Sequence, residues 1–178
     1  MKIAIIGYSG SGKSTLANRL GEYYSCEVLH LDRIHFSSDW TERADEAMLA
    51  DLKSFLEKES WVIDGNYNRM LYQERMKSSD CILFLNFNRF TCLFRAFKRY
   101  QTYKGKVRPD MADGCREKLD WEFIRWILFD SRKKKRKDSY KKLQIEYCDK
   151  MRIFKNQRQL DRFLRTLKNS QTDGSQIK

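Results

Sequence analysis

The sequence predicts an α/β fold with three layers, in which a parallel five-stranded sheet lies between helices on both faces. Short apolar runs rich in β-branched residues alternate along the chain with segments whose apolar residues recur at helical spacing. Helical crossovers of this kind make neighbouring strands parallel and cover both faces of the sheet. A glycine-rich segment directly after the first apolar run also suits a tight turn from a strand into a helix.

The first part of the chain supplies three of the predicted strands. The apolar runs Lys2–Ile6, Glu27–Leu31 and Trp61–Ile63 each have the length and composition of a buried strand. A helix over about Lys13–Tyr24 separates the first two runs, and a helix over about Glu42–Glu57 precedes the third. The second helix has its apolar residues on one face, as expected for a helix that covers a sheet.

The remainder supplies the last two strands and their helices. Cys81–Leu85 is a continuous apolar run, and Asn88 is placed to cap a helix that begins near Arg89. Met151–Phe154 is the fifth predicted strand. Three further helices are predicted over Leu119–Arg132, Ser139–Cys148 and Arg158–Leu167.

Two polar segments are predicted outside these elements. Tyr103–Lys118 holds Gly105, Pro109 and Gly114 and is expected to be a mobile loop. Residues 169–178 are expected to be a flexible polar tail. Residues 1–168 then form one domain that is long enough to bury a full core.

A complete phosphate-binding loop follows the first strand, where residues 7–15 read G-Y-S-G-S-G-K-S-T. The glycines let backbone N–H groups surround an anion, and the N-terminus of the next helix adds its positive dipole end. Lys13 is expected to reach the β- and γ-phosphates of a nucleoside triphosphate, and Ser14 to bind Mg²⁺. The residues predicted to bind the nucleotide here are Gly7, Ser9, Gly10, Ser11, Gly12, Lys13, Ser14 and Thr15. The sequence therefore predicts a P-loop NTPase fold.

Residues at the carboxyl ends of the other strands are expected to join this loop, because ligands of parallel sheets bind at that edge. Asp32, Asp64 and Arg89 follow the second, third and fourth strands. We predict Asp64 as the second Mg²⁺ ligand rather than Asp80, which precedes the fourth strand and lies at the opposite edge. The alternative for Asp64 is a helix cap, and for Asp32 a helix or turn cap.

Charge and cysteine content narrow the class of protein. The net charge is +12, and part of it suits the chemistry of phosphorylated ligands. The six consecutive cations of Arg132–Lys137 could contact nucleic acid, but no aromatic residues interleave with them, which favours a solvated helix end. The five scattered cysteines form no C-x-x-C pair, and no apolar run reaches membrane-spanning length. We therefore expect a cytoplasmic protein with reduced cysteines.

The chain resembles the P-loop small-molecule kinases, the group that contains adenylate, shikimate and gluconate kinases. Residues 62–69, V-I-D-G-N-Y-N-R, look like the D-G-F-P-R segment of adenylate kinase, widened by one residue and without its phenylalanine and proline. The resemblance implies that Asp64 serves the metal and that Arg69 holds an acceptor phosphate. Because phenylalanine and proline are absent, the segment departs from the pattern of a nucleoside monophosphate acceptor.

The same resemblance implies a lid. Arg95 and Arg99 lie one turn apart on a predicted helix and resemble the paired arginines at the lid entrance of these kinases. Residues 103–118 would then form a short lid that carries Arg108 and Arg116 and excludes water. Lys13, Arg95, Arg99, Arg108 and Arg116 are expected to neutralise the phosphoryl group during its transfer.

A closer resemblance covers nearly the whole chain. It rests on five short strings: Leu29-His30-Leu31-Asp32, Ile63-Asp64-Gly65-Asn66-Tyr67, Phe87-Asn88-Arg89, Arg108-Pro109-Asp110-Met111 and Lys155-Asn156-Gln157-Arg158. These strings look like the bacterial FlaR-type DNA topology modulation proteins, which are similar to adenylate kinase. Their label suggests an effect on DNA without specifying a chemical activity.

The resemblance to small-molecule kinases also implies where the two substrates bind. In these kinases the loop after the second strand cradles the acceptor, so Asp32 could accept the proton of its hydroxyl group. The acceptor-binding residues expected are Asp32, His35, Trp40 and Arg43 in and near that loop, together with Asn66 and Arg69 after the third strand. Trp40 either stacks on a planar acceptor or covers the core. His35 is interpreted as a structural hydrogen-bonding residue, and Asn156 is expected near the adenine of ATP.

The resulting prediction is an ATP- and Mg²⁺-dependent phosphotransferase that acts on a small, nucleotide-like acceptor. ATP is preferred over GTP because the chain has no N-K-x-D string. A nucleic-acid-associated NTP-binding protein and a slow regulatory NTPase are the alternatives.

Overall fold

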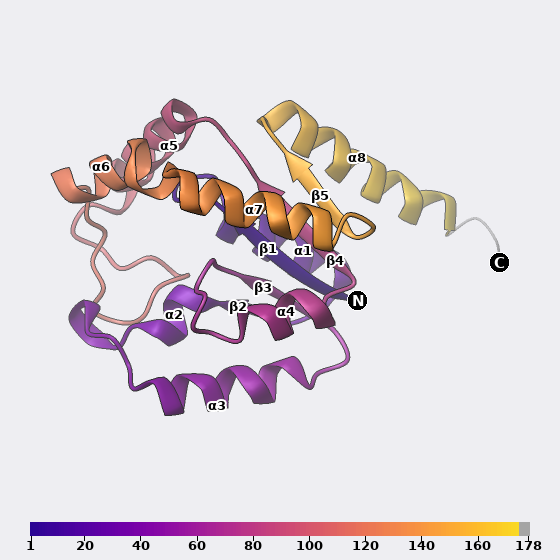
Figure 1. Ribbon diagram of the computed structural model, residues 1–178, viewed down its shortest axis with the longest axis horizontal. Helices are drawn as coiled ribbons and strands as arrows, with labels where there is room; N and C mark the ends of the chain where they lie inside the picture. Colours follow the sequence, from indigo (N-terminus) through magenta and orange to yellow (C-terminus); the bar gives the residue numbers. More distant parts are fainter. Residues whose placement is uncertain (175–178) are drawn as a thin grey trace.

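Five parallel strands form the central sheet of the computed structural model, which describes residues 1–174 (Figure 1). The strands are β1 Lys2–Gly7, β2 Val28–His30, β3 Trp61–Asp64, β4 Cys81–Leu85 and β5 Met151–Phe154. They lie in the order β2-β3-β1-β4-β5, and each neighbouring pair is parallel. The predicted α/β fold and its five-stranded parallel sheet are therefore confirmed.

Helices cover both faces of this sheet. They are α1 Lys13–Tyr24, α2 Leu31–His35, α3 Asp45–Leu56, α4 Tyr72–Ser78, α5 Arg89–Tyr103, α6 Trp121–Leu128, α7 Lys134–Glu146 and α8 Gln157–Gly174, with 3₁₀ turns η1 Ser38–Trp40 and η2 Asp130–Arg132. In Figure 1, α4 and α7 lie on the near side of the sheet and α1 lies behind it. This arrangement gives the three predicted layers.

The central strands are buried along nearly their whole length. Ala4, Ile5 and Ile6 of β1 are fully inaccessible to solvent, as are Trp61 and Val62 of β3. A strand covered on both faces needs apolar residues at consecutive positions instead of alternating ones. This requirement explains why continuous apolar runs predicted the strands correctly.

Two short elements and several boundaries differ from the sequence-based prediction. The chain turns into α2 at Leu31, a residue that the prediction kept in the second strand. Helix α4 was missed because its buried face includes a charged residue, Arg75, which breaks the apolar pattern. The last helix continues beyond Leu167 to Gly174, so part of the expected polar tail is helical; residues 175–178 lie outside the described part of the chain.

The cationic run also lies differently from the expectation of a solvated helix end favoured by the dipole. Helix α7 begins at Lys134, so four cations occupy its first turn, next to the positive end of the helix dipole. Tyr140 and Leu143 anchor α7 against the core and set where the helix runs. Lys133 is balanced by Asp130 at 2.7 Å, and Arg136 lies 4.9 Å from the centre of the Trp126 ring.

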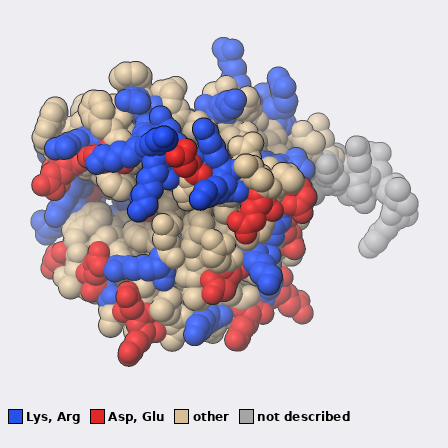
Figure 2. Space-filling model, in the orientation of Figure 1, with Lys and Arg blue, Asp and Glu red and all other residues tan. Residues whose placement is uncertain are grey.

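Basic side chains gather over α7 in the upper half of the view in Figure 2, whereas the lower half mixes acidic and basic groups. Across residues 1–174, none of the helices combines the length and the apolar character that crossing a membrane requires.

Candidate functional site

The loop between β1 and α1 is tightly packed against α5. Gly10 and Gly12 adopt positive φ angles of 76° and 92°, which favour glycine. A Cβ atom on Gly10 would lie 2.3 Å from the carbonyl oxygen of Cys92, so any other residue there would displace α5. The glycines of the motif are therefore required both by the turn and by the close approach of α5.

Ser14 and Asp64 meet at the predicted metal position. The Ser14 hydroxyl donates a hydrogen bond of 3.0 Å to Oδ2 of Asp64, which is 5% exposed at the end of β3. Asp64 is thus not a helix cap, whereas Asp80 accepts a 2.7 Å bond from the Lys2 backbone N–H at the opposite edge. A hydroxyl and a carboxylate beside a phosphate loop are oxygen ligands that fit Mg²⁺.

His30 orients the Asp64 carboxylate. Nδ1 of His30 lies 2.6 Å from Oδ1 of Asp64, and Nε2 lies 3.0 Å from Oδ1 of Asn18. Burial opposes a charge on this ring, but the hydrogen bond and the charge of Asp64 outweigh it and raise the pKa of His30. The pair leaves Oδ2 of Asp64 directed at Ser14.

Asn66 holds the phosphate loop from behind instead of lining the pocket. Its Oδ1 accepts a 3.0 Å hydrogen bond from the Gly7 N–H, and its Nδ2 donates to the Gly7 carbonyl oxygen. Both ends of the amide are engaged, so the predicted contact with an acceptor does not follow from this geometry. Asn66 ties the loop after β3 to the end of β1.

Replacing Asn66 by alanine is expected to destabilise the fold by about 1–3 kcal/mol, because buried polar groups of Gly7 lose their partners. The dissociation constant for ATP is expected to rise about tenfold, since both hydrogen bonds that hold Gly7 at the start of the phosphate loop are lost. Urea denaturation and titration calorimetry measure the two effects. Asn68→Ala, at an exposed position in the same loop, is the matched control; equal effects of the two variants would contradict this role.

Arg75, which the sequence did not single out, supports the same loop. Its side chain is fully buried, and it donates to the carbonyl oxygens of Met70 at 2.8 Å, Gly65 at 3.2 Å and Tyr67 at 2.9 Å. Burial lowers the pKa of Arg75 to about 10, which keeps it charged at neutral pH. The guanidinium group therefore shapes residues 65–70, from which Asn66 and Tyr67 reach the site.

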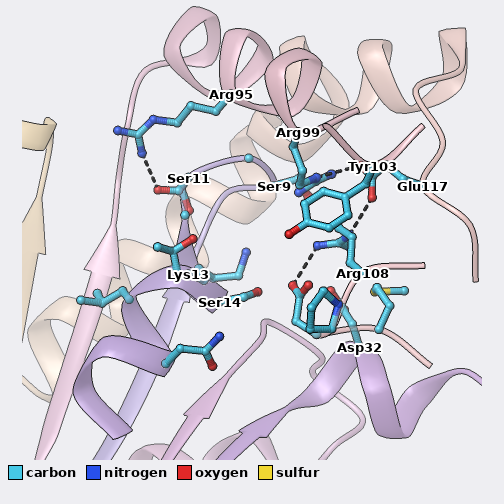
Figure 3. Close-up of a pocket in the computed structure, with 18 of the residues that line it drawn as sticks. Ser9, Ser11, Lys13, Ser14, Asp32, Arg95, Arg99, Tyr103, Arg108 and Glu117 are labelled. Atoms are coloured by element: carbon cyan, nitrogen blue, oxygen red, sulfur yellow. Dashed lines mark hydrogen bonds and ion pairs between the residues drawn. The ribbon is translucent and has the colours of Figure 1, made fainter. Parts of the chain in front are cut away.

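A pocket of about 1260 Å³ extends from the phosphate loop to the loop of residues 103–118 (Figure 3). Ser9 to Thr15 form one side, and they include all the predicted phosphate-loop residues except Gly7. The opposite side contains Asp32, Phe36, Trp40, Tyr67, Arg99, Arg108, Asp110, Met111, Glu117 and Lys118. The structure therefore brings Lys13, Asp32, Arg95, Arg99 and Arg108 to one cavity, as predicted for the catalytic set.

Arg95 binds the phosphate loop directly. It donates to the Ser11 carbonyl oxygen at 2.9 Å and to Oε1 of Gln157 at 2.6 Å. Gln157 lines the pocket, whereas Asn156 is exposed and caps α8 by accepting a 3.0 Å bond from the Gln159 N–H. The predicted adenine contact of Asn156 stays a prediction, and in this geometry Asn156 serves as the cap of α8.

Glu117, also missed by the sequence analysis, joins the two arginines of the lid region. Its side chain is 2% exposed and lies 2.7 Å from Nε of Arg99 and 2.6 Å from Nε of Arg108. Arg108 also pairs with Asp110 at 2.8 Å. Arg116 is exposed and does not line the pocket. Glu117 is one of three acidic residues in this loop, so no sequence signal singled it out.

The loop of residues 103–118 is docked against η1. Met111, Ala112 and Cys115 form a small apolar cluster that packs on Phe36 and Trp40. The Cys115 thiol donates to the Ser37 carbonyl oxygen at 3.3 Å. The loop therefore covers the side of the pocket that faces the phosphate loop.

Asp32 faces this covered space. Its Oδ1 accepts a 2.6 Å hydrogen bond from the Tyr67 hydroxyl, and both residues line the pocket. Burial raises the pKa of Tyr67, so the phenol stays protonated and donates to the carboxylate. Tyr67 thereby holds one oxygen of Asp32 in place.

Besides Asn66, three predicted acceptor residues do not line the pocket. His35 is buried beside the Tyr67 ring, and burial lowers its pKa, in agreement with the structural interpretation. Arg43 pairs with Asp51 at 2.8 Å, and Arg69 is paired with Glu42. Contact of these residues with an acceptor does not follow from this geometry, and the sequence does not reveal the partners that the fold gives Arg43 and Arg69.

The sheet order and the phosphate loop together define a P-loop fold of the kind found in small-molecule kinases. Shikimate kinase from Bacteroides thetaiotaomicron superposes with a TM-score of 0.53 at 18% identity, covering 97% of this chain and 98% of the other. Deoxyadenosine kinase from M. mycoides superposes with a TM-score of 0.52 at 15% identity, covering 96% of this chain and all of the other. These likenesses show the fold alone.

At the sequence level, no family model matches the chain. A gluconokinase from Arabidopsis thaliana is 32% identical over an alignment of 95 residues, and the match covers 44% of this chain and 49% of that protein. The chain thus spans about half the length of this curated relative.

Proposed function

We propose that this protein is an ATP-dependent phosphotransferase that acts on a small, nucleotide-like acceptor. The observation that carries the proposal is a single covered pocket with a complete phosphate loop on one side and a carboxylate, Asp32, on the other. The similarity to a gluconokinase over 95 residues supports the same class of reaction. The resemblance to FlaR-type proteins remains a prediction.

Different residues of the chain have different roles in phosphoryl transfer. The loop N–H groups and Lys13 hold the β- and γ-phosphates, and Arg99 and Arg108 neutralise the charge on the transferring group. Asp32 accepts the proton of the acceptor hydroxyl, whose oxygen forms a bond to the γ-phosphorus as the bond to the ADP oxygen breaks. The docked loop of residues 103–118 keeps water away from this step.

Ser14 and Asp64 would hold Mg²⁺ in this reaction. When bound, the ion adds positive charge beside the β- and γ-phosphates. His30 keeps the Asp64 carboxylate oriented toward that position through its 2.6 Å contact.

Glu117→Gln is expected to lower kcat about tenfold and to change KM for ATP much less, because its carboxylate positions Arg99 and Arg108 during transfer. Steady-state kinetics with varied ATP at a saturating concentration of the acceptor measure both constants. The matched control is Glu122→Gln, at an exposed position on α6. An unchanged kcat in Glu117→Gln would contradict the proposal that Glu117 positions the two arginines.

The proposal is tested by Mg²⁺-dependent ADP release from ATP in the presence of nucleosides, nucleoside monophosphates, sugars, hydroxy acids or short oligonucleotides. ADP release that needs both one small acceptor and Lys13 is the expected outcome. Stimulation by oligonucleotides alone would favour the nucleic-acid-associated alternative, with the cations of Arg132–Lys137 as the contact. Slow ADP release that no acceptor stimulates would favour a regulatory NTPase.

A further inference from the structure

We infer that the acceptor is an uncharged, planar molecule with a free hydroxyl group, of the nucleoside class, and not one that already carries a phosphate or carboxylate. This inference rests on the proposed kinase function and names the substrate of the same pocket. Two independent observations carry it: the aromatic wall of the acceptor side and the distribution of charges around it.

The aromatic wall consists of Phe36 and Trp40. Both line the pocket, and their ring centroids are 5.3 Å apart at an interplanar angle of 67°. Met111 of the docked loop packs on the same cluster and also lines the cavity. Flat aromatic and thioether surfaces around a cavity favour a planar ligand such as a nucleobase.

The position of Trp40 is firmly fixed. Asp39 and Trp40 adopt φ angles of 57° and 64°, in the left-handed region that bulky residues rarely occupy. The indole N–H donates to the Arg116 carbonyl oxygen at 3.2 Å, and the Trp40 backbone N–H donates to Cys115 Sγ at 3.3 Å. Strain held by surrounding contacts is common at ligand-binding positions. These contacts keep the indole at the pocket wall.

The cations expected to bind an anionic acceptor are engaged elsewhere. Arg69 is paired with Glu42, Arg43 is paired with Asp51, and neither arginine lines the cavity. Because both guanidinium groups already have carboxylate partners, an acceptor phosphate would have to break these ion pairs to recruit them.

Two of the cations that line the acceptor side, Arg99 and Arg108, are balanced by carboxylates. Arg99 and Arg108 share Glu117, and Arg108 also pairs with Asp110. Asp32 adds a third carboxylate, and Lys118 lies at an exposed position 5.6 Å from the Trp40 ring centre. A phosphate or carboxylate in this space would lie in the same cavity as Asp32 and Asp110, whose negative charges would repel it. A hydroxyl group instead donates to Asp32 without a charge penalty.

The first experiment compares kcat/KM for a purine and a pyrimidine nucleoside with the values for their 5′-monophosphates and for two hydroxy acids, shikimate and gluconate. Each nucleoside is expected to exceed its monophosphate by about 30-fold or more, because the monophosphate brings a charge toward Asp32 and Asp110. Lys13-dependent transfer that prefers a monophosphate or a hydroxy acid would overturn the inference while the kinase function stands. Absence of Lys13-dependent transfer to any acceptor would instead overturn the proposed function.

A variant tests the charge argument within one protein. Asp110→Asn removes a negative charge from the pocket and is expected to lower the ratio of nucleoside to monophosphate kcat/KM about fivefold. Asp113→Asn, at an exposed position in the same loop, is the matched control and should keep the wild-type ratio. Because the ratio compares two acceptors on one enzyme, a general loss of stability does not move it. An unchanged ratio in Asp110→Asn would overturn the charge argument.

A binding measurement tests the aromatic wall. A nucleoside that stacks on Trp40 is expected to quench the tryptophan fluorescence of the protein, and Trp40→Phe should lose most of that quenching. Trp121→Phe is the control, because Trp121 is 77% exposed and lies outside the pocket. Equal quenching of the wild type and Trp40→Phe would place the ligand away from this wall and overturn the assignment.

Discussion

Replacing Lys13 by methionine is expected to lower kcat/KM for ATP-dependent phosphoryl transfer about 10³-fold or more, because the ammonium group stabilises charge on the transferring phosphate. Methionine keeps the apolar stem and removes only the charge. The coupled detection of ADP, or direct analysis of the phosphorylated acceptor, measures the loss.

The melting temperature separates this effect from unfolding. Burial lowers the pKa of Lys13 from its usual range, so its charged form is less favourable in the folded protein than in the unfolded chain. This difference lowers stability at every pH at which the unfolded side chain is charged, which includes neutral pH. Lys13→Met is therefore expected to melt no lower than the wild type, and Lys2→Met, at the start of β1, serves as a charge-matched control. Activity within tenfold of wild type would contradict the assigned role.

Replacing Arg75 by methionine is expected to destabilise the protein by about 3–5 kcal/mol, since several buried carbonyl oxygens lose their donors together. Met70, Gly65 and Tyr67 supply those oxygens, and Arg75 is fully buried among them. Chemical denaturation measures the loss directly, and the melting temperature should fall by roughly 10 °C or more.

Two companion variants sharpen this prediction. Arg75→Lys keeps the charge but cannot direct N–H groups to carbonyl oxygens in a planar fork, so it should recover less than half of the loss. Lys77→Met, at an exposed position on the same helix, should change stability by no more than about 0.5 kcal/mol. A similar result for Arg75→Met and Lys77→Met would show that the carbonyl contacts contribute little.

Some elements of the fold follow from local sequence patterns, whereas others depend on contacts with distant parts of the chain. Continuous apolar runs gave the five strands because the sheet is covered on both faces, and the spacing of α1 gave its bounds without error. Helix α4 was missed by the sequence-based prediction because its buried face carries Arg75. The polar groups of Arg75 donate hydrogen bonds to carbonyl oxygens of a neighbouring loop. The start of α7 was missed because a run of cations is unfavourable at a helix N-terminus.

Some residues of the candidate site could likewise be predicted from local sequence patterns, and others could not. Lys13, Ser14 and Asp64 could be assigned because each immediately follows a recognisable strand or lies within a contiguous motif. Asn66 and Arg69 were predicted to bind the acceptor. In the structure Asn66 is hydrogen-bonded to Gly7, and Arg69 forms an ion pair with Glu42. Such pairings join residues far apart in the sequence, and no local pattern encodes them.

The parallel α/β fold, the phosphate loop and the edge of the sheet at which the site lies could be predicted from sequence patterns alone. These features depend on short-range spacing, on glycine geometry and on the rule that parallel strands end at one edge. The pairing of charges in and around the pocket could be known only from the folded structure. Glu117 pairs with Arg99 and Arg108, and Glu42 pairs with Arg69, because the fold brings together opposite charges that are separated in the chain.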